Sequence, residues 1–298
     1  MTTRRNLLLG CAMACAPWLG SAADPAALRL VVGFAPGGGT DVAARLVADR
    51  LAAELAQAVL VENRAGAGGT IGALSVMRAA PDGQTLFFGT GAEMLINPIT
   101  RKAPPYELLK DFVPVVEVGG VSFVLIVPTA SPVDSLAALV ARARSDRLAY
   151  ASFGVGSTNH LLGEWFLSAA GVGATHVPYP GSAPALTALL GGQVDFGFET
   201  LAVALPQIRA GKARALATPS PQRLRDLPEV PTLQESGFAG LAGEGWMGVF
   251  APAGTPQATV QRLNAALNRV LRRDDIAAAF TERGVRTAGV PRTTSARS

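Results

Sequence analysis

The chain has 298 residues, 49% hydrophobic and 16% charged, so it can build one large domain or two ordinary ones. Lysine and arginine number 26 against 22 aspartates and glutamates, which gives a formal net charge of +4. The arginines are scattered and no block of like charge occurs. This pattern excludes the basic footprint of a nucleic-acid-binding protein.

The N-terminus has the parts of an export signal. Arg4 and Arg5 supply positive charge, residues 7–19 are largely apolar, and a Ser-Ala-Ala sequence provides a cleavage site. The apolar stretch is shorter than the roughly 20 residues that span a bilayer. We therefore expect residues 1–23 to be a signal peptide and the mature protein to be exported. Twin-arginine export and a lipid anchor at Cys11 are the alternatives.

Cysteine and histidine are scarce. Both cysteines, Cys11 and Cys15, lie in the expected signal, so the mature chain has no thiol for a disulfide, a metal site or a nucleophile. The two histidines, His160 and His176, are too few for a histidine-rich metal site. We expect no metal and no cofactor.

From Leu28 onward, short apolar runs alternate with helical patterns, as in parallel β-α units. Strands are expected at 28–34, 58–64, 85–90 and 122–128. The first helix has one apolar stripe, formed by Ala44, Val47, Ala48, Leu51 and Leu55.

A second group of elements follows. Strands are expected at 148–154, 174–179, 193–198 and 213–218, with helices from about residue 157, from Ser182 to Gly191, and before Gly211. A last strand at 244–252 precedes a helix that begins at Thr255-Pro256.

The two groups predict an α/β protein of two lobes that close about a hinge. The strands at 121–128 and 244–252 would cross between the lobes, so that the C-terminal helices return to the first. The first lobe would then comprise residues 24–122 and 246–298, and the second residues 123–245. Composition alone does not distinguish this architecture from a single doubly wound sheet.

A glycine-rich turn, Pro36 to Gly39, follows the first strand. Thr40 and Asp41 stand where a P-loop has Lys and Ser/Thr, and Val42 occupies the last glycine position of the dinucleotide fingerprint. What remains is a run of backbone N–H groups at a helix N-terminus, which suits a carboxylate. Asp41 is expected to cap the helix or to hold the turn. The alternative is an ordinary strand-to-helix turn.

A second glycine-rich turn follows the second strand. Gly66, Gly68 and Gly69 precede another helical pattern, and Ile71 breaks the dinucleotide fingerprint here too. Ligands of open α/β sheets bind beyond the carboxyl ends of the strands. Two such turns at one sheet edge therefore favour a ligand site.

In the second lobe, Ser157 or Thr158 can cap a helix and offer a hydroxyl to an anion. The surrounding Gly-Val-Gly-Ser-Thr sequence is not a nucleophile elbow. His160 either bonds the loop or packs, or it is the base of a hydrolase that uses Ser157 as nucleophile.

Two further side chains have two interpretations each. Tyr179 lines the cleft or is a core aromatic with a wet edge. Glu199, at the end of an expected strand, either pairs with an ammonium group of a ligand or stabilises the start of the next helix.

Nine stretches resemble, in order, the substrate-binding proteins of tripartite tricarboxylate transporters, the Bug family. They are GFAPGGGTD, VENRAGAGGTIGA, KDFVPV, GSTNHLLGEWF, HVPYPG, LLGGQVDFGF, IRAGKARALA, LPEVPTLQESG and WMGVFAPAGTP. The resemblance implies a periplasmic location, a two-lobe fold like the type II periplasmic binding proteins, and a receptor without catalysis. Residues 34–41 and 66–70 would receive one carboxylate, partly through water, and residues 154–160 the other end of the ligand.

The resemblance implies a small carboxylate or amino-acid ligand and integral membrane transporter subunits as partners; a periplasmic sensor is the alternative partner. We expect a monomer. Pro180 stands where the family often has lysine, and the family usually continues through another helix where this chain ends. The candidate ligand-binding residues are Phe34, Ala35, Pro36, Gly37, Gly38, Asp41, Gly68, Gly69, Thr90, Ser152, Gly156, Ser157, Thr158, His160, Tyr179 and Glu199.

Overall fold

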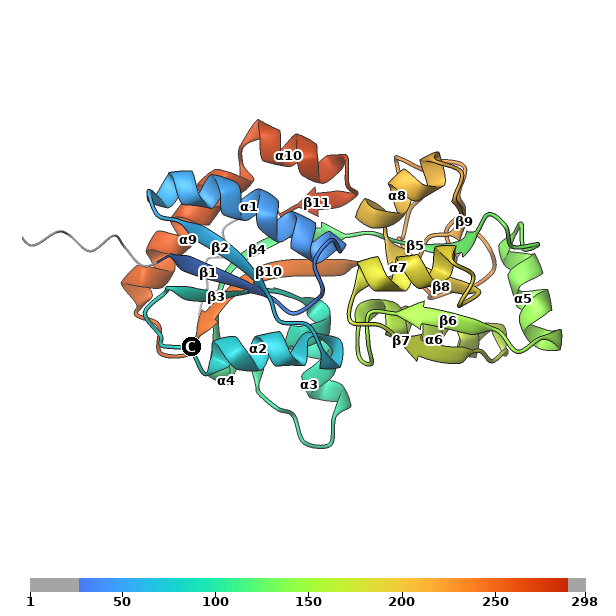
Figure 1. Ribbon diagram of the computed structural model, residues 1–298, viewed down its shortest axis with the longest axis horizontal. Coiled ribbons are helices and arrows are strands. Elements are labelled where there is room, and N and C mark those ends of the chain that lie inside the picture. Colours follow the sequence, from blue (N-terminus) through green and yellow to red (C-terminus); the bar gives the residue numbers. More distant parts are fainter. Residues whose placement is uncertain (1–26, 289–298) are drawn as a thin grey trace, which may run out of the picture.

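The computed structural model describes residues 27–288. The expected signal peptide, residues 1–23, lies outside the described residues. Two lobes lie side by side along the long axis of the molecule, each with a β-sheet flanked by helices (Figure 1). The predicted α/β, two-lobe fold is therefore confirmed, and the single doubly wound sheet is excluded.

The sheet of the first lobe has six strands in the order β11-β4-β10-β3-β1-β2. β1 pairs in parallel with β2 and β3, whereas β10 and β11 run antiparallel to their neighbours. The strands are β1 (Leu28–Val32), β2 (Val59–Asn63), β3 (Thr85–Thr90), β4 (Phe112–Val121), β10 (Gly245–Pro252) and β11 (Val285–Thr287).

Helices cover both faces of this sheet (Figure 1). They are α1 (Gly39–Leu55), α2 (Thr70–Met77), α3 (Asn97–Thr100), α4 (Leu108–Asp111), α9 (Gln257–Leu271) and α10 (Asp274–Thr281), with a 3-10 turn η1 (Ala67–Gly69) and a π turn η2 (Ala92–Ile96). The predicted stripe of α1 is buried, apart from the half-buried Leu55, and packs against β1 and α9. Burying this stripe attaches the helix to the sheet and so fixes where its N-terminus lies.

The second lobe has a five-stranded sheet in the order β7-β6-β8-β5-β9. β6, β7 and β8 run parallel, and β5 is antiparallel to β8 and β9. Its elements are β5 (Phe123–Pro128), α5 (Leu136–Ser145), β6 (Ala149–Ser152), α6 (Thr158–Ala170), β7 (Thr175–Pro178), α7 (Ser182–Leu190), β8 (Phe196–Thr200), α8 (Leu201–Arg209) and β9 (Ala213–Ala217).

The chain passes between the sheets at two places. β4 ends at Val121 in the first sheet and β5 begins at Phe123 in the second, while β10 returns to pair with β3 and β4. Residues 24–122 with 246–298, and residues 123–245, remain the lobe extents that we propose.

The strand β4 was not expected from the sequence. Pro114 and the Gly119-Gly120 pair are residues that strands usually avoid. β10 nevertheless pairs with β4 through two register shifts, which accommodate the irregular strand. The partner strand thus stabilises a segment whose own sequence does not favour a strand.

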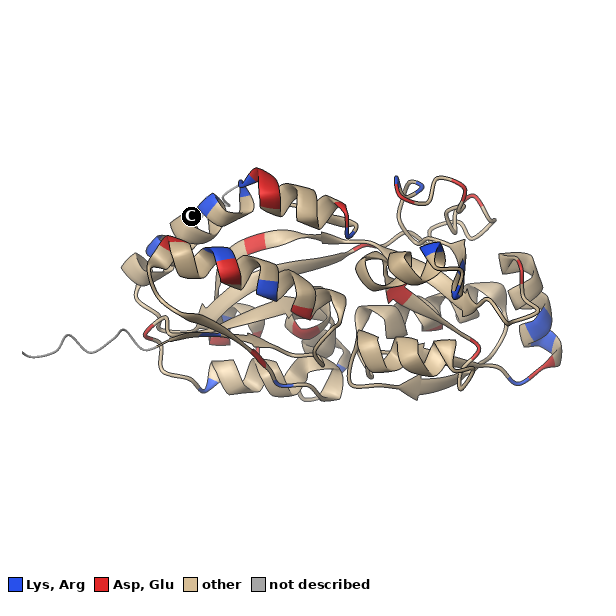
Figure 2. Cartoon of the chain, turned by 45° about the horizontal axis from the view of Figure 1, so that its top comes forward, with Lys and Arg blue, Asp and Glu red and all other residues tan. Residues whose placement is uncertain are grey.

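Charged residues are spread over the outer helices and loops of both lobes without forming one large patch (Figure 2). None of the helices in residues 27–288 is both long and apolar enough to span a membrane. Within the same residues, no group of three or more His, Cys, Asp or Glu side chains could hold a metal ion.

Candidate functional site

A pocket lies between the two lobes. The first lobe contributes Phe34, Thr40, Thr90, Ala92, Val121, Gly245 and Trp246, and the second contributes Phe123, Phe153, Ser157, Thr158 and Thr200. All of its lining residues are apolar or hydroxyl-bearing, with no ionisable side chain among the residues described there. An anion in this pocket would therefore be stabilised by dipoles and hydrogen bonds instead of by a side-chain cation.

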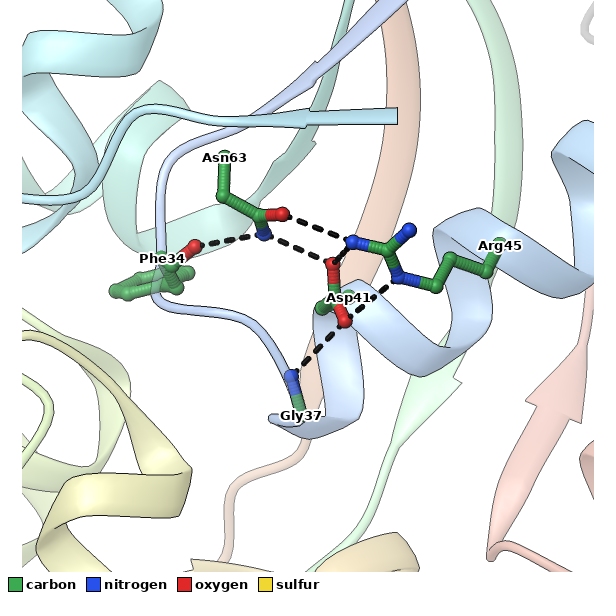
Figure 3. A network of polar contacts seen from close by, with 5 residues as sticks. All are labelled: Phe34, Gly37, Asp41, Arg45 and Asn63. Carbon is green, nitrogen blue, oxygen red and sulfur yellow. Dashed lines mark hydrogen bonds and ion pairs between the residues drawn. The ribbon is translucent and has the colours of Figure 1, made fainter. Parts of the chain in front are cut away.

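The turn before α1 is held by one buried carboxylate, that of Asp41. Its Oδ2 accepts hydrogen bonds from the N–H of Gly37 (2.9 Å) and from Arg45 Nε (3.0 Å). Its Oδ1 accepts from Arg45 Nη2 (2.9 Å) and from Asn63 Nδ2 (2.8 Å), and Asn63 Nδ2 also donates to Phe34 O (Figure 3). Asp41 thus holds the turn, one of its two predicted roles, and does not face the pocket.

Electrostatics keep Asp41 charged. Burial raises the pKa of its carboxyl, but hydrogen bonds from Arg45, Gly37 and Asn63 outweigh that effect and hold the pKa below its ordinary value. Its negative charge is paired with Arg45 on the same helix. Because the acid is neutralised locally, the N–H groups of Gly39 and Thr40 are left with the positive end of the helix dipole.

Several backbone N–H groups of the loop before α6 are bonded to acceptors in the same segment. The N–H of Phe153 donates to Asn159 Oδ1 (3.2 Å), and that of Gly154 donates to Ser152 Oγ (3.1 Å). The N–H of Gly156 donates to His160 Nδ1 (3.3 Å), and that of Ser157 donates to Gly154 O (3.1 Å). Ser157 is the N-cap residue of α6, yet its hydroxyl makes no capping bond. The first turn of α6 begins at Thr158, which lines the pocket, and the N–H groups of a first helical turn have no acceptor within the helix.

The geometry contradicts a Ser157–His160 hydrolase pair. Ser157 Oγ lies 2.6 Å from Gly154 O and 2.8 Å from Asn159 Oδ1, the two acceptors for its one proton, and His160 Nδ1 accepts the N–H of Gly156. His160 packs on His176 with ring centroids 4.2 Å apart. The serine hydroxyl and the imidazole thus have other partners within the described structure, so the arrangement does not support a serine activated by His160.

The histidine that does contact a serine is His176, whose Nε2 lies 2.5 Å from Ser152 Oγ. Ser152 is fully buried and does not line the pocket. Burial and the neighbouring His160 lower the pKa of His176 to about 4, so both rings are neutral at pH 7. This cluster supports the loop from behind.

The lobes touch across the pocket. The N–H of Ala35 donates to Pro180 O at 3.1 Å. A Cβ placed on Gly38 would lie 3.1 Å from Ser182 Cβ, and one on Gly68 would lie 2.4 Å from Val155 O. Because glycine has no Cβ, the backbone at these positions can approach the Ser182 side chain and the Val155 backbone of the other lobe closely.

Behind the pocket, each lobe buries a glutamate against a lining threonine. Glu93 accepts from the N–H (2.9 Å) and hydroxyl of Thr90. Glu199 Oε1 accepts from Thr200 N (2.7 Å), Thr200 Oγ1 (3.1 Å) and Ser182 Oγ (2.7 Å). Burial raises the pKa of Glu93 to about 7 and that of Glu199 to about 8.

Of the residues predicted to bind ligand, Phe34, Thr90, Ser157 and Thr158 line the pocket. Glu199 lies behind Thr200, only 3% exposed, and this position does not support pairing with a ligand ammonium. The remaining predicted residues are not among those that line the pocket, and their part in binding stays a prediction: Ala35, Pro36, Gly37, Gly38, Asp41, Gly68, Gly69, Ser152, Gly156, His160 and Tyr179.

Sequence reasoning missed several lining residues, above all Phe123, Phe153 and Trp246. Each lies at an end of an expected strand, where its apolar side chain is indistinguishable from a core residue. Thr40 could have been predicted from the sequence, because it directly follows the glycine-rich turn Pro36 to Gly39.

Two α/β lobes enclosing an interlobe pocket, with helix N-termini facing it, define the class of two-lobe solute-binding proteins. The sequence model of the tripartite tricarboxylate transporter family receptor matches residues 43–291. The chain belongs to that family.

Individual proteins of similar sequence and structure support this family assignment. Protein BugT of Bordetella pertussis is 39% identical over 260 residues, covering 86% of this chain and 80% of BugT. The structure of the periplasmic binding protein BugD matches with a TM-score of 0.86 and 34% identity, over 88% of each chain. MatC from Rhodopseudomonas palustris, solved with bound malate, matches with a TM-score of 0.84 and 35% identity, over 88% of this chain and 90% of MatC.

Proposed function

We propose that this protein is a periplasmic receptor that binds a small carboxylate between its lobes and delivers it to membrane transporter subunits. The observation that carries the proposal is the meeting of two helix ends at one pocket. Thr40 in the first turn of α1 and Thr158 in the first turn of α6 come from different lobes and both line it. Two positive dipole ends facing one pocket without a nearby cation suit a carboxylate.

Closure supplies the affinity in this proposal. A ligand that contacts both lobes stabilises the shut arrangement by the contacts that it makes only there. The contact between Ala35 and Pro180 adds to the shut state. The malate bound to MatC supports a carboxylate as the ligand class.

The test is thermal unfolding of residues 24–298 against a panel of monocarboxylates, dicarboxylates, tricarboxylates and acidic amino acids. A ligand present at 100 times its dissociation constant stabilises the folded state by about 2.7 kcal/mol. Small-angle scattering with the same ligand should show a more compact particle. Cooperative unfolding without a shift for any carboxylate would contradict the proposal.

Delivery to a transporter needs its own experiment. Uptake of the identified ligand should be lost when the gene is deleted and restored by the full chain with its expected signal peptide. If uptake persists in the deletion strain while a ligand-dependent transcriptional response disappears, the partner is a periplasmic sensor domain instead.

A further inference from the structure

The hydroxyl groups of the pocket are mostly occupied already. Five hydroxyl-bearing residues line it: Thr40, Thr90, Ser157, Thr158 and Thr200. The hydroxyl of Thr90 donates to Glu93, that of Thr200 to Glu199, and that of Ser157 to Gly154 O.

Only Thr40 and Thr158 keep a hydroxyl that makes no hydrogen bond to other described residues. These two belong to the first turns of α1 and α6, where the free backbone N–H groups also lie. The free hydroxyl and helix-end donors on the pocket wall thus lie at these two helix N-termini, one from each lobe.

Four aromatic side chains make up most of the remaining wall, beside Ala92, Val121 and Gly245. Phe34 of the first lobe and Phe153 of the second meet edge to face, with ring centroids 6.4 Å apart at 74°. Phe123 and Trp246 complete this surface, and the indole N–H of Trp246 makes no hydrogen bond to the part of the chain described. One neutral N–H can accommodate an oxygen substituent, but it cannot replace the hydration of a second carboxylate.

Acidic groups lie behind this wall as well. Two buried acidic side chains, Glu93 and Glu199, are each bonded to a lining threonine. No arginine or lysine lines the described pocket. A second carboxylate on the ligand would therefore lose its hydration without gaining an ion pair.

We propose that the pocket selects an aromatic monocarboxylate over short dicarboxylates and tricarboxylates. The carboxylate binds the first turns of α1 and α6, and the ring packs among Phe34, Phe123, Phe153 and Trp246. This inference rests on the proposed function, because it names the ligand class of the same pocket. Aromatic rings favour edge-to-face and offset contacts with one another, which strengthens binding beyond the apolar area buried.

The experiment is calorimetric titration of the mature chain with benzoate, benzamide and succinate. Benzoate should bind at least about tenfold more tightly than succinate, and benzamide, which lacks the anion, should bind too weakly to measure. Tighter binding of succinate would overturn the aromatic selectivity and leave the carboxylate receptor standing. Binding of neither acid, with the chain folded, would overturn this inference, and failure of the whole carboxylate panel would also overturn the proposed function.

A variant tests the ring directly. Phe153→Leu keeps an apolar side chain and should weaken benzoate by about threefold to tenfold, with succinate unchanged. Phe238→Leu is the matched control, since Phe238 packs on Phe166 in the same lobe and does not line the pocket. An equal loss for benzoate and succinate in Phe153→Leu would show that the ring acts on the fold and not on the ligand.

Discussion

Gly39, the first residue of α1, lies directly against Thr200 of the other lobe. A Cβ placed on Gly39 would come within 2.9 Å of Thr200 Oγ1 and 3.3 Å of Thr200 Cβ. The contact joins the two lobes at a residue that lines the pocket, Thr200, and we expect opening of the lobes to break it. A methyl group added at Gly39 should therefore hinder closure of the lobes without disturbing the folding of either lobe.

Gly39→Ala should therefore weaken carboxylate binding by about tenfold or more and abolish ligand-dependent compaction in small-angle scattering. The unliganded chain should unfold at the same temperature or slightly higher, because alanine is the better helix former. Gly173→Ala is the matched control, since a Cβ on Gly173 meets nothing within 4 Å. Unchanged affinity in Gly39→Ala would contradict a binding mode that needs full closure.

Asp41→Asn should loosen the turn that precedes α1. The substitution removes the charge that Arg45 pairs with, and places an amide opposite the Asn63 Nδ2 donor. Losing charge-assisted hydrogen bonds at this buried site should cost about 1–3 kcal/mol of unfolding free energy and lower ligand affinity. Denaturant titration measures the first and calorimetry the second. Asp49→Asn, an exposed change on the same helix, should alter neither.

Glu199 should make stability and binding fall as the pH rises. Its pKa is raised to about 8 in the folded chain from 4.5, so its contribution is complete below pH 4.5 and is lost as the pH rises through 8. Above that pH its negative charge behind Thr200 also repels a bound carboxylate. Between pH 5 and 9, stability and affinity should depend less steeply on pH in Glu199→Gln than in the wild type, and the remaining slope should come from Glu93, whose pKa is raised to about 7. The exposed change Glu229→Gln should retain the wild-type slope.

His176 should make the stability fall as the pH is lowered, which is opposite to the effect of Glu199. Its pKa is lowered to about 4 from 6.5, so the stability gained from the neutral ring is present above pH 6.5 and lost as the pH falls through 4. His176→Gln should remove this acid sensitivity of unfolding between pH 4 and 6.5. Glu199 changes the stability with pH in the opposite direction. The unfolding free energies of the wild type and His176→Gln are therefore compared at each pH. Equal slopes for wild type and His176→Gln would refute the assignment.

Local patterns in the sequence predicted many of the helices and strands correctly. The stripe on α1 is buried as the 3.6-residue period predicts, and Gly191 ends α7 where the sequence placed it. The segment from Phe112 to Val121 escaped prediction because its strand depends on pairing with β10, over a hundred residues away. The helix α10 was also not anticipated.

The sequence by itself determined the alternation of strands and helices, the two glycine turns and the family, because these depend on local spacing and on residue identity. Only the tertiary structure decided which groups line the pocket and which donors are free. Ser157, Thr90 and Thr200 carry the same hydroxyl chemistry as Thr40 and Thr158, yet they bond to neighbours inside the fold. A hydrogen bond depends on where folding brings its acceptor, so the residues available to a ligand emerge only when both lobes are in place.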